Sequence, residues 1–454
     1  MQRFYLFVLA CSSWLAQPPA AQAQNPAPAA TAANSRSIGL AEAVQLALAA
    51  SKDLKRNEAA QRQAAARVQQ ARDGVVPGVQ LSSTFLRLSD NVTPFSVGLP
   101  GRGDVVLNPQ ILNQSYNSLQ VRQLLWAGGK VRLGIEAARR EQEATQAEAD
   151  QYRLLAADNV TTIWYDLYTL NASEKIIREN SALLQDRRRE LTNLERQGVV
   201  LKIDGLKIEL AIARLESALA DIRSGQAINS FNLALATGLP TSTTFAPTET
   251  ALPAAQPLPP LADYQQQALA SRAELKAMTL RREAALVGQR IVRGNTLPVL
   301  SFGGTVDYNR PNLRVFPAEA QFKATSSVFA NLTWDVGSLY ANRARVAETR
   351  FGLEQLGIGL EQLSEGIQIE VNASYRAYEQ ALEKIRVAEN AITLAEENFR
   401  VEQNRFKAST ITPADFLDAN TQLVQARLDL TTAQANAELA RWKLLKSTGR
   451  LTAN

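Results

Sequence analysis

The sequence predicts a mainly α-helical fold that is built twice along the chain, with four β-strands inserted between very long helices. Three observations carry this prediction. Alanine, glutamine, leucine, glutamate and arginine dominate the 454 residues, and this composition favours long helices. The two halves of the chain share one order of predicted elements. Two proline-free stretches of roughly 65 residues keep a helical pattern, and at 1.5 Å per residue each is on the order of 100 Å long.

The N-terminus is typical of a secretory signal peptide over residues 1–23. Arg3 supplies the positive n-region, residues 4–15 the apolar h-region, and residues 21–23 an A-x-A cleavage site. The only cysteine, Cys11, lies inside this segment. The alternative is a lipoprotein in which Cys11 is the lipidated first residue. Cleavage at the A-x-A site leaves a mature chain without cysteine, so neither a disulfide nor thiol chemistry is expected.

The composition argues against several classes of function. Charged residues make up 20% of the chain, both signs are interleaved and the net charge is +5, so no nucleic-acid partner is expected. The absence of histidine removes the commonest general base and the commonest transition-metal ligand. No P-loop or G-x-G-x-x-G sequence follows a predicted strand. We therefore expect no catalytic residues, no metal site and no cofactor, and we do not expect an enzyme.

An internal repeat organises the chain. Five stretches of the first half have counterparts in the same order in the second half. The pairs are 40–55 with 261–276, Pro77 with Pro298, 126–129 with 334–337, the set Gly198, Asp204 and Leu206 with Ser409, Asp415 and Leu417, and 237–238 with 448–449. We therefore divide the mature chain into a first structural repeat (24–239), a Pro-rich linker (240–260) and a second structural repeat (261–450).

Each repeat predicts the same elements in the same order. These are a helix, a strand, a loop rich in Gly, Pro and Asn, a second strand, a very long helix and a last helix. In the first repeat they are 40–73, 79–88, 89–117, 118–126, 130–197 and a helix that ends at Thr237. In the second they are 261–293, 299–308, 309–320, 322–334, 338–407 and a helix that ends at Thr448.

The strand predictions rest on alternation. In the last strand Phe322, Ala324, Val328, Ala330, Leu332 and Trp334 share one face, and Lys323, Thr325, Ser327, Asn331 and Thr333 share the other, with Phe329 as the exception. These faces suit a wall with lipid outside and water inside, and they suit an ordinary half-buried sheet equally well. Trp126 and Trp334, at strand ends, are expected either at a membrane interface or packed at the junction of sheet and helices.

The long helices favour a water-exposed coiled coil. Their apolar residues keep a narrow stripe, for example Ile163, Leu167 and Leu170, and then Leu184, Leu191 and Leu194. Such a stripe buries a coiled-coil seam and not a thick core. A soluble periplasmic coiled-coil scaffold is therefore the alternative function. A scaffold of this kind does not explain four strands inserted at the same places in two repeats.

Two motifs, each present twice, resemble those of a known family. A Trp-x-x-Gly turn leads each second strand into its long helix, at 126–129 and 334–337. A hairpin-tip pattern has a small residue, Asp six positions later, and then Leu and Ala. In the second repeat it spans Ser409 to Ala419. Together with the duplicated plan, these motifs resemble the outer-membrane efflux family, the TolC-like channel-tunnel proteins, over nearly the whole mature chain.

The resemblance implies a fold, a location and partners. The expected fold is mainly α with a membrane β-barrel part: long helical hairpins form an α-helical tunnel, and four strands per protomer contribute to the 12-stranded barrel of a homotrimer. The protein is expected in the cell outer membrane, in contact with lipid and spanning into the periplasm. Its expected function is the exit duct of a tripartite efflux or type I secretion system for small molecules or polypeptides. A periplasmic adaptor protein and an inner-membrane transporter are its expected partners.

The resemblance also singles out the breaks before the last helices, which form the periplasmic tip. Asp204, Asp415 and Asp418 match acidic residues that constrict or select at the entrance. Gly198, Ser409 and Thr410 match the part of the tip that docks on the adaptor. The alternative for Asp204 and Asp415 is structural, because acids are favoured in the first turn of a helix. The best-known gated members carry a tyrosine and an arginine that lock the closed tip, and here Phe406 and Ile411 stand in their places. Nearby basic residues are the candidate substitutes, namely Arg196, Lys202 and Lys407.

Overall fold

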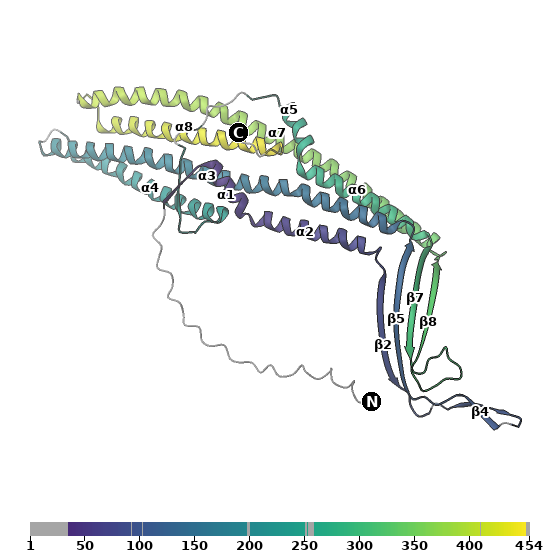
Figure 1. Ribbon diagram of the computed structural model, residues 1–454. Coiled ribbons are helices and arrows are strands. Elements are labelled where there is room, and N and C mark those ends of the chain that lie inside the picture. Colours follow the sequence, from purple (N-terminus) through teal and green to yellow (C-terminus); the bar gives the residue numbers. More distant parts are fainter. Residues whose placement is uncertain are drawn as a thin grey trace, which may run out of the picture.

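The computed structural model is elongated, with a β-sheet at one end and the turns of two helical hairpins at the other (Figure 1). It describes residues 35–450 except 92, 102, 198–199, 250–251, 253–257 and 409. The predicted signal peptide and Cys11 therefore lie outside the described residues.

Two long helical hairpins form the body of the molecule. The first joins α3 (Lys130–Arg196) to α4 (Lys202–Thr237), and the second joins α7 (Ser338–Lys407) to α8 (Pro413–Ser447). The helix α3 packs on α4 and α8, and α8 packs on α7, so the tip half is a layer in the order α4, α3, α8, α7. The two predicted long helices are confirmed. Within the described part of the chain, no helix has both the length and the apolar character needed to cross a membrane.

Shorter helices flank the long ones toward the sheet. They are α1 (Leu40–Ala50), α2 (Lys52–Asp73), α5 (Leu261–Ser271), α6 (Ala273–Arg293) and the 3₁₀ turn η1 (Gly294–Thr296). The helix α2 packs on α3, and α6 packs on both α3 and α7. The predictions of single helices over 40–73 and 261–293 are therefore wrong, because each of these segments is broken once.

The two breaks have local and tertiary causes. The backbone of Ser51 leaves the helical region (φ −52°, ψ 120°), and its Oγ accepts a hydrogen bond from the Leu54 N–H at 3.3 Å, which caps α2. At the equivalent position Arg272 donates hydrogen bonds to the Glu370 carboxylate (2.8 Å) and the Ser447 carbonyl (3.1 Å). These bonds tie the second corner to α7 and to the end of α8.

Four strands form an antiparallel sheet beyond the helices. Their order is β2 (Gly78–Arg87), β5 (Asn113–Trp126), β7 (Val299–Asn309) and β8 (Lys323–Thr333). All four predicted strands are present. The strand β5 begins at Asn113, before the predicted Ser118, because the added residues pair with the last residues of β2.

The register gives the sheet one apolar face and one polar face. Exposed apolar side chains share the first face: Val79, Leu81, Phe85, Leu119, Val121, Phe302, Val306, Tyr308, Val328 and Leu332. The opposite face carries Gln80, Ser82, Thr84, Ser118, Gln120, Arg122, Thr305, Asp307, Thr325, Ser327 and Asn331. The exception, Phe329, lies on the polar face against Gly303, where a Cβ would meet its ring at 2.8 Å. The guanidinium of Arg122 lies 5.9 Å from the same ring.

Two small sheets lie in segments predicted to be irregular. The predicted loop 89–117 contains the hairpin of β3 (Phe95–Leu99) and β4 (Gly103–Asn108), whose turn uses the positive φ of Gly101 and Gly103. In the predicted linker, β6 (Thr244–Pro247) pairs in parallel with β1 (Ser35–Ile38). The Trp164 indole N–H donates to the Ile38 carbonyl at 3.1 Å. These contacts anchor both strands on the core around Trp164.

Candidate functional site at the hairpin tips

The tips are the two turns at the end of the molecule farthest from the sheet (Figure 1). Residues 197–201 join α3 to α4, and residues 408–412 join α7 to α8. Two of the predicted docking residues, Gly198 and Ser409, lie outside the described residues. The third, Thr410, donates from its N–H and its hydroxyl to the Arg405 carbonyl, both at 2.9 Å. Thr410 thereby closes the end of α7.

Asp415 occupies a capping box at the start of α8. Its Oδ2 accepts from the Thr412 N–H (3.0 Å) and the Thr412 hydroxyl (2.8 Å), while its own N–H donates to Thr412 Oγ1 (3.3 Å). The Thr412 hydroxyl bond is the main cause that holds the pKa of Asp415 below its ordinary value, followed by the Thr412 N–H bond and the charges of Arg405 and Lys207. The helix-start interpretation of Asp415 is therefore confirmed as local geometry.

The other two acids lie differently. Asp418 is exposed one turn further along α8, and it forms no hydrogen bond or ion pair with the described residues. Asp204 is half-buried in the first turn of α4, and no direct bond joins it to Asp415 or Asp418 among the residues that the structure describes. The tip therefore presents one capping carboxylate and one free carboxylate on α8, with a separate acid on α4.

An aromatic cluster joins the two hairpins behind the tips. Phe416 is fully buried, with its ring centroid 5.0 Å from Phe406 and 5.6 Å from Phe399, both on α7. The Arg187 guanidinium of α3 lies 5.9 Å from the same ring. The cluster also packs against buried apolar residues of the first hairpin, namely Leu184, Leu191 and Ile208. Phe416 is thus the side chain on which both hairpins converge.

Phe406 and Ile411, which the resemblance aligns with the lock of gated members, are part of this apolar cluster. Phe406 stacks on Phe416, and Ile411 is one of the partly buried residues that pack against it. The side chains of the candidate substitutes, Arg196, Lys202 and Lys407, make no hydrogen bond or ion pair with the described residues, and their role in a lock stays a prediction. A different arginine, Arg188, crosses from α3 to Glu209 on α4 at 2.5 Å. It lies over Gly205, where a Cβ would meet its guanidinium at 3.1 Å.

The comparison of the sequence with known families places the chain. It matches the family described as outer membrane efflux protein over residues 43–239 and again over 265–450. The chain belongs to this family. The two matched segments correspond to the two halves of the internal repeat. The family and the fold are those of an outer-membrane efflux channel and not those of an enzyme.

Solved structures of outer-membrane channels share the fold. The chain is 15% identical to the CmeC channel of Campylobacter jejuni, with a TM-score of 0.72 over 90% of this chain and 85% of that one. It is 17% identical to VceC of Vibrio cholerae, with a TM-score of 0.69 and coverage of 90% and 96%. It is 16% identical to the open state of MtrE of Neisseria gonorrhoeae, with a TM-score of 0.69 over 90% of this chain and 88% of that one. No curated protein matches the chain significantly.

Sequence reasoning missed the aromatic cluster of this efflux protein. Phe399 and Phe406 are seven residues apart, which is a coiled-coil spacing, and Phe416 follows the break. That spacing is the signal that could have revealed the cluster. Trp126 and Trp334 lie at the junction of sheet and helices, both about half exposed, and the Trp334 indole donates to the Thr296 carbonyl at 3.1 Å. No group of three His, Cys, Asp or Glu suited to a metal ion occurs among the described residues.

Proposed function

We propose that three copies of this efflux protein form the exit duct of a tripartite system that spans the outer membrane and reaches into the periplasm. The observation that carries the proposal is that one chain is an open strip with two unpartnered edges. The sheet ends at β2 and β8, and the helical layer ends at α4 and α7. Each edge of the strip therefore consists of a strand edge and a helix edge, and both can be closed by a neighbouring copy.

The sheet edges support a barrel made of several copies. The strand β8 runs antiparallel to β2, so β8 of one copy can pair with β2 of the next without a change of pattern. Unpaired backbone groups are costly in lipid, which favours a closed ring. Four strands do not enclose a useful bore, whereas three copies give twelve strands. With 14 residues in β5 and 11 in β8, the strands are long enough for a tilted crossing.

The two faces of the sheet support the same arrangement. The exposed apolar face defined above suits contact with outer-membrane lipid, and the opposite face suits a water-filled lumen. We propose that Trp126 and Trp334 lie at the periplasmic membrane interface, because both indoles are half exposed at the end of the sheet that joins the helices.

The helix edges carry complementary apolar stripes. On α4 the exposed large side chains are Ile203, Leu206, Leu210, Ile228, Phe231 and Leu235, with small residues at the intervening heptad positions. On α7 the exposed residues Val387, Leu394 and Val401 recur every seven positions. Heptad stripes of this kind seek a partner helix. We propose that α4 of one copy packs on α7 of the next, which closes the tunnel wall.

The proposed partners act at the tips. A periplasmic adaptor docks on the loops that contain Gly198, Ser409 and Thr410, and it links the duct to an inner-membrane transporter. Asp415 and Asp418, three copies of each, form an acidic ring at the entrance, with Asp204 as a further acid. Such a ring favours cations over anions. The cargo is a small molecule or a polypeptide.

Fractionation and single-channel recording test the proposal. We expect a heat-modifiable trimer in the outer-membrane fraction. Release of the mature chain by osmotic shock would support the soluble scaffold instead. In planar bilayers, Asp415→Asn with Asp418→Asn should lower cation selectivity and leave the trimer intact. The control, Asp53→Asn with Asp73→Asn on α2, should leave both the selectivity and the trimer unchanged. A lower melting temperature with unchanged selectivity would mean that the two tip acids act only at the helix start.

A further inference from the structure

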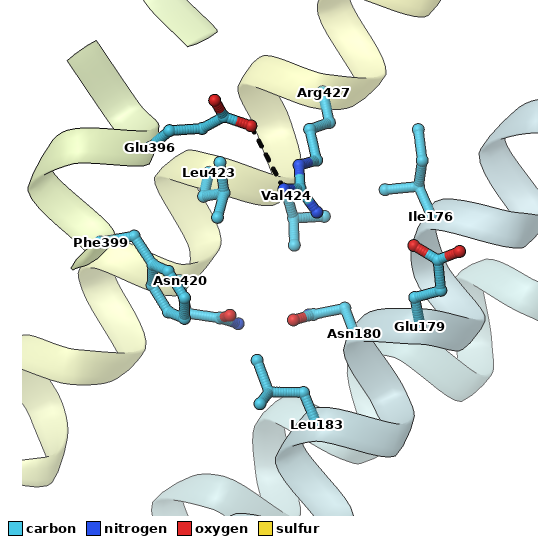
Figure 2. Close-up of a pocket in the computed structure, with 10 residues that line it drawn as sticks. All are labelled: Ile176, Glu179, Asn180, Leu183, Glu396, Phe399, Asn420, Leu423, Val424 and Arg427. Carbon is cyan, nitrogen blue, oxygen red and sulfur yellow. Dashed lines mark hydrogen bonds and ion pairs between the residues drawn. The ribbon is translucent and has the colours of Figure 1, made fainter. Parts of the chain in front are cut away.

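A pocket lies between the two hairpins, on the sheet side of the aromatic cluster. It has a volume of about 250 Å³ and is lined by α3, α7 and α8. Its apolar walls are Ile176 and Leu183 on α3, Phe399 on α7, and Leu423 and Val424 on α8. Figure 2 shows that polar side chains from both hairpins also point into this space.

Two buried amides face each other across the pocket. Asn420 of α8 is 2% exposed and Asn180 of α3 is 8% exposed, and Figure 2 shows their side chains pointing toward one another. Neither amide forms a hydrogen bond with any residue that the structure describes. The amide atoms stay accessible to solvent through the pocket. A ligand that enters the pocket can therefore bond to both amides in place of water.

The charge of the pocket selects the sign of that ligand. Arg427 and Glu396 form an ion pair at 3.3 Å, which leaves the pair neutral. Glu179, on the turn of α3 beside Asn180, makes no ion pair or hydrogen bond with the described residues. The lining therefore carries one uncompensated negative charge. The two amide oxygens add acceptors that can bond to a cation.

We propose that this pocket binds an aliphatic ammonium group. Its alkyl part lies against Leu183, Phe399 and Leu423. Its three N–H donors are received by the Asn180 and Asn420 oxygens and the Glu179 carboxylate. An anion is disfavoured because Glu179 repels it and Arg427 is already paired. An uncharged alkyl group leaves both amides unsatisfied.

The proposal concerns binding and does not require the duct to conduct. Two sources carry the same chemistry, a free amphiphilic amine and a lysine side chain of a docked protein. The probes are n-hexylammonium for the first source and Nα-acetyl-lysine methylamide for the second. Hexanoate and 1-hexanol, which keep the chain length and change or remove the charge, are the controls. Isothermal titration of the full-length protein in a non-ionic detergent measures each affinity.

The expected result is saturable binding of n-hexylammonium, with hexanoate and 1-hexanol much weaker. Glu179→Gln should weaken binding by about 1.5-fold to fivefold, the range expected for one exposed charge. Asn420→Leu should weaken it as well. The matched variant Glu216→Gln removes an exposed charge from α4, away from the pocket, and should bind as the wild type does. Competition by the lysine probe would identify a protein-borne amine as a second source, and its absence would restrict the site to free amines.

Three results would overturn the proposal. The first is equal binding of 1-hexanol and n-hexylammonium, which indicates an apolar slot only. The second is an equal loss of affinity in Glu216→Gln and Glu179→Gln, which indicates a diffuse surface effect. The third is no saturable binding of either amine. Because Asn420 is buried, a variant there that fails to fold is set aside, and the exposed Glu179→Gln variant decides the question.

Discussion

Replacement of Phe416 by alanine should loosen the contact between the two hairpins at their tips. The ring is fully buried, contacts Phe406 and Phe399 at centroid distances of 5.0 and 5.6 Å, and lies 5.9 Å from the Arg187 guanidinium. Truncation of a buried phenylalanine to alanine costs about 3–5 kcal/mol. Because each 1.4 kcal/mol is about a factor of ten, the opened tip should become at least about a hundredfold more populated.

Hydrogen exchange of backbone amides is the assay for this change. We expect amides in the first turns of α8 and the last turns of α3 to exchange faster in Phe416→Ala, while amides near the sheet keep their wild-type rates. Phe416→Leu keeps most of the apolar volume and should recover most of the protection. Phe351→Ala removes a half-exposed ring of α7 outside the cluster. It should change stability by no more than about 0.5 kcal/mol.

The reasoning is refuted if tip amides in Phe416→Ala exchange at the rates found in Phe351→Ala. In that case the hairpins are held together by backbone and coiled-coil contacts elsewhere along α3 and α8. If protection falls along the whole length of both hairpins, Phe416 supports the entire helical layer and not the tip alone.

Three further predictions concern the tip, the sheet and its loop. Because the pKa of Asp415 is lower in the folded chain, its stabilisation of the α8 start is present above the ordinary value of 3.8 and is lost as pH falls through the folded value. The protection factors of the tip amides, corrected for the intrinsic pH dependence of exchange, should fall there in the wild type and stay unchanged in Asp415→Asn. Gly303→Ala places a Cβ against the Val121 carbonyl and should abolish sheet assembly, measured as loss of heat-modifiable trimer, whereas Gly304→Ala should be milder. We expect residues 89–117 and 309–320 to be the extracellular loops of the barrel, so an epitope inserted near Gly101 should be labelled on intact cells; labelling only after permeabilisation would reverse this orientation.

The position of the tip acids was partly predictable. The segment Thr412 to Asp415 has the residues of a capping box, which is a local motif, and the structure forms it. The electrostatic surroundings of Asp415 were not predictable, because the charge of Lys207 on α4, in the other hairpin, helps to lower its pKa. Whether the carboxylates select ions depends on the proposed assembly of three copies, and this stays a prediction.

The sequence by itself determined the long helices, the internal repeat and the alternation of the four strands. These features depend on the periodicity of neighbouring residues, which is a local property. The alternation did not distinguish a membrane wall from an ordinary half-buried sheet. The strand register decided that one face is apolar and exposed, because it aligns the apolar residues of four strands on one side.

Only the tertiary structure decided the contacts between distant segments. The break at Arg272, the pairing of β1 with β6, and the facing amides of Asn180 and Asn420 all depend on partners far away in the sequence, whereas the break at Ser51 has a local cap. The same holds for Phe416, whose neighbours come from three helices. Periodicity tells which face of a helix is apolar, but it does not tell which helix that face meets. That choice is made by packing, and packing places the tip cluster and the pocket where the two hairpins meet.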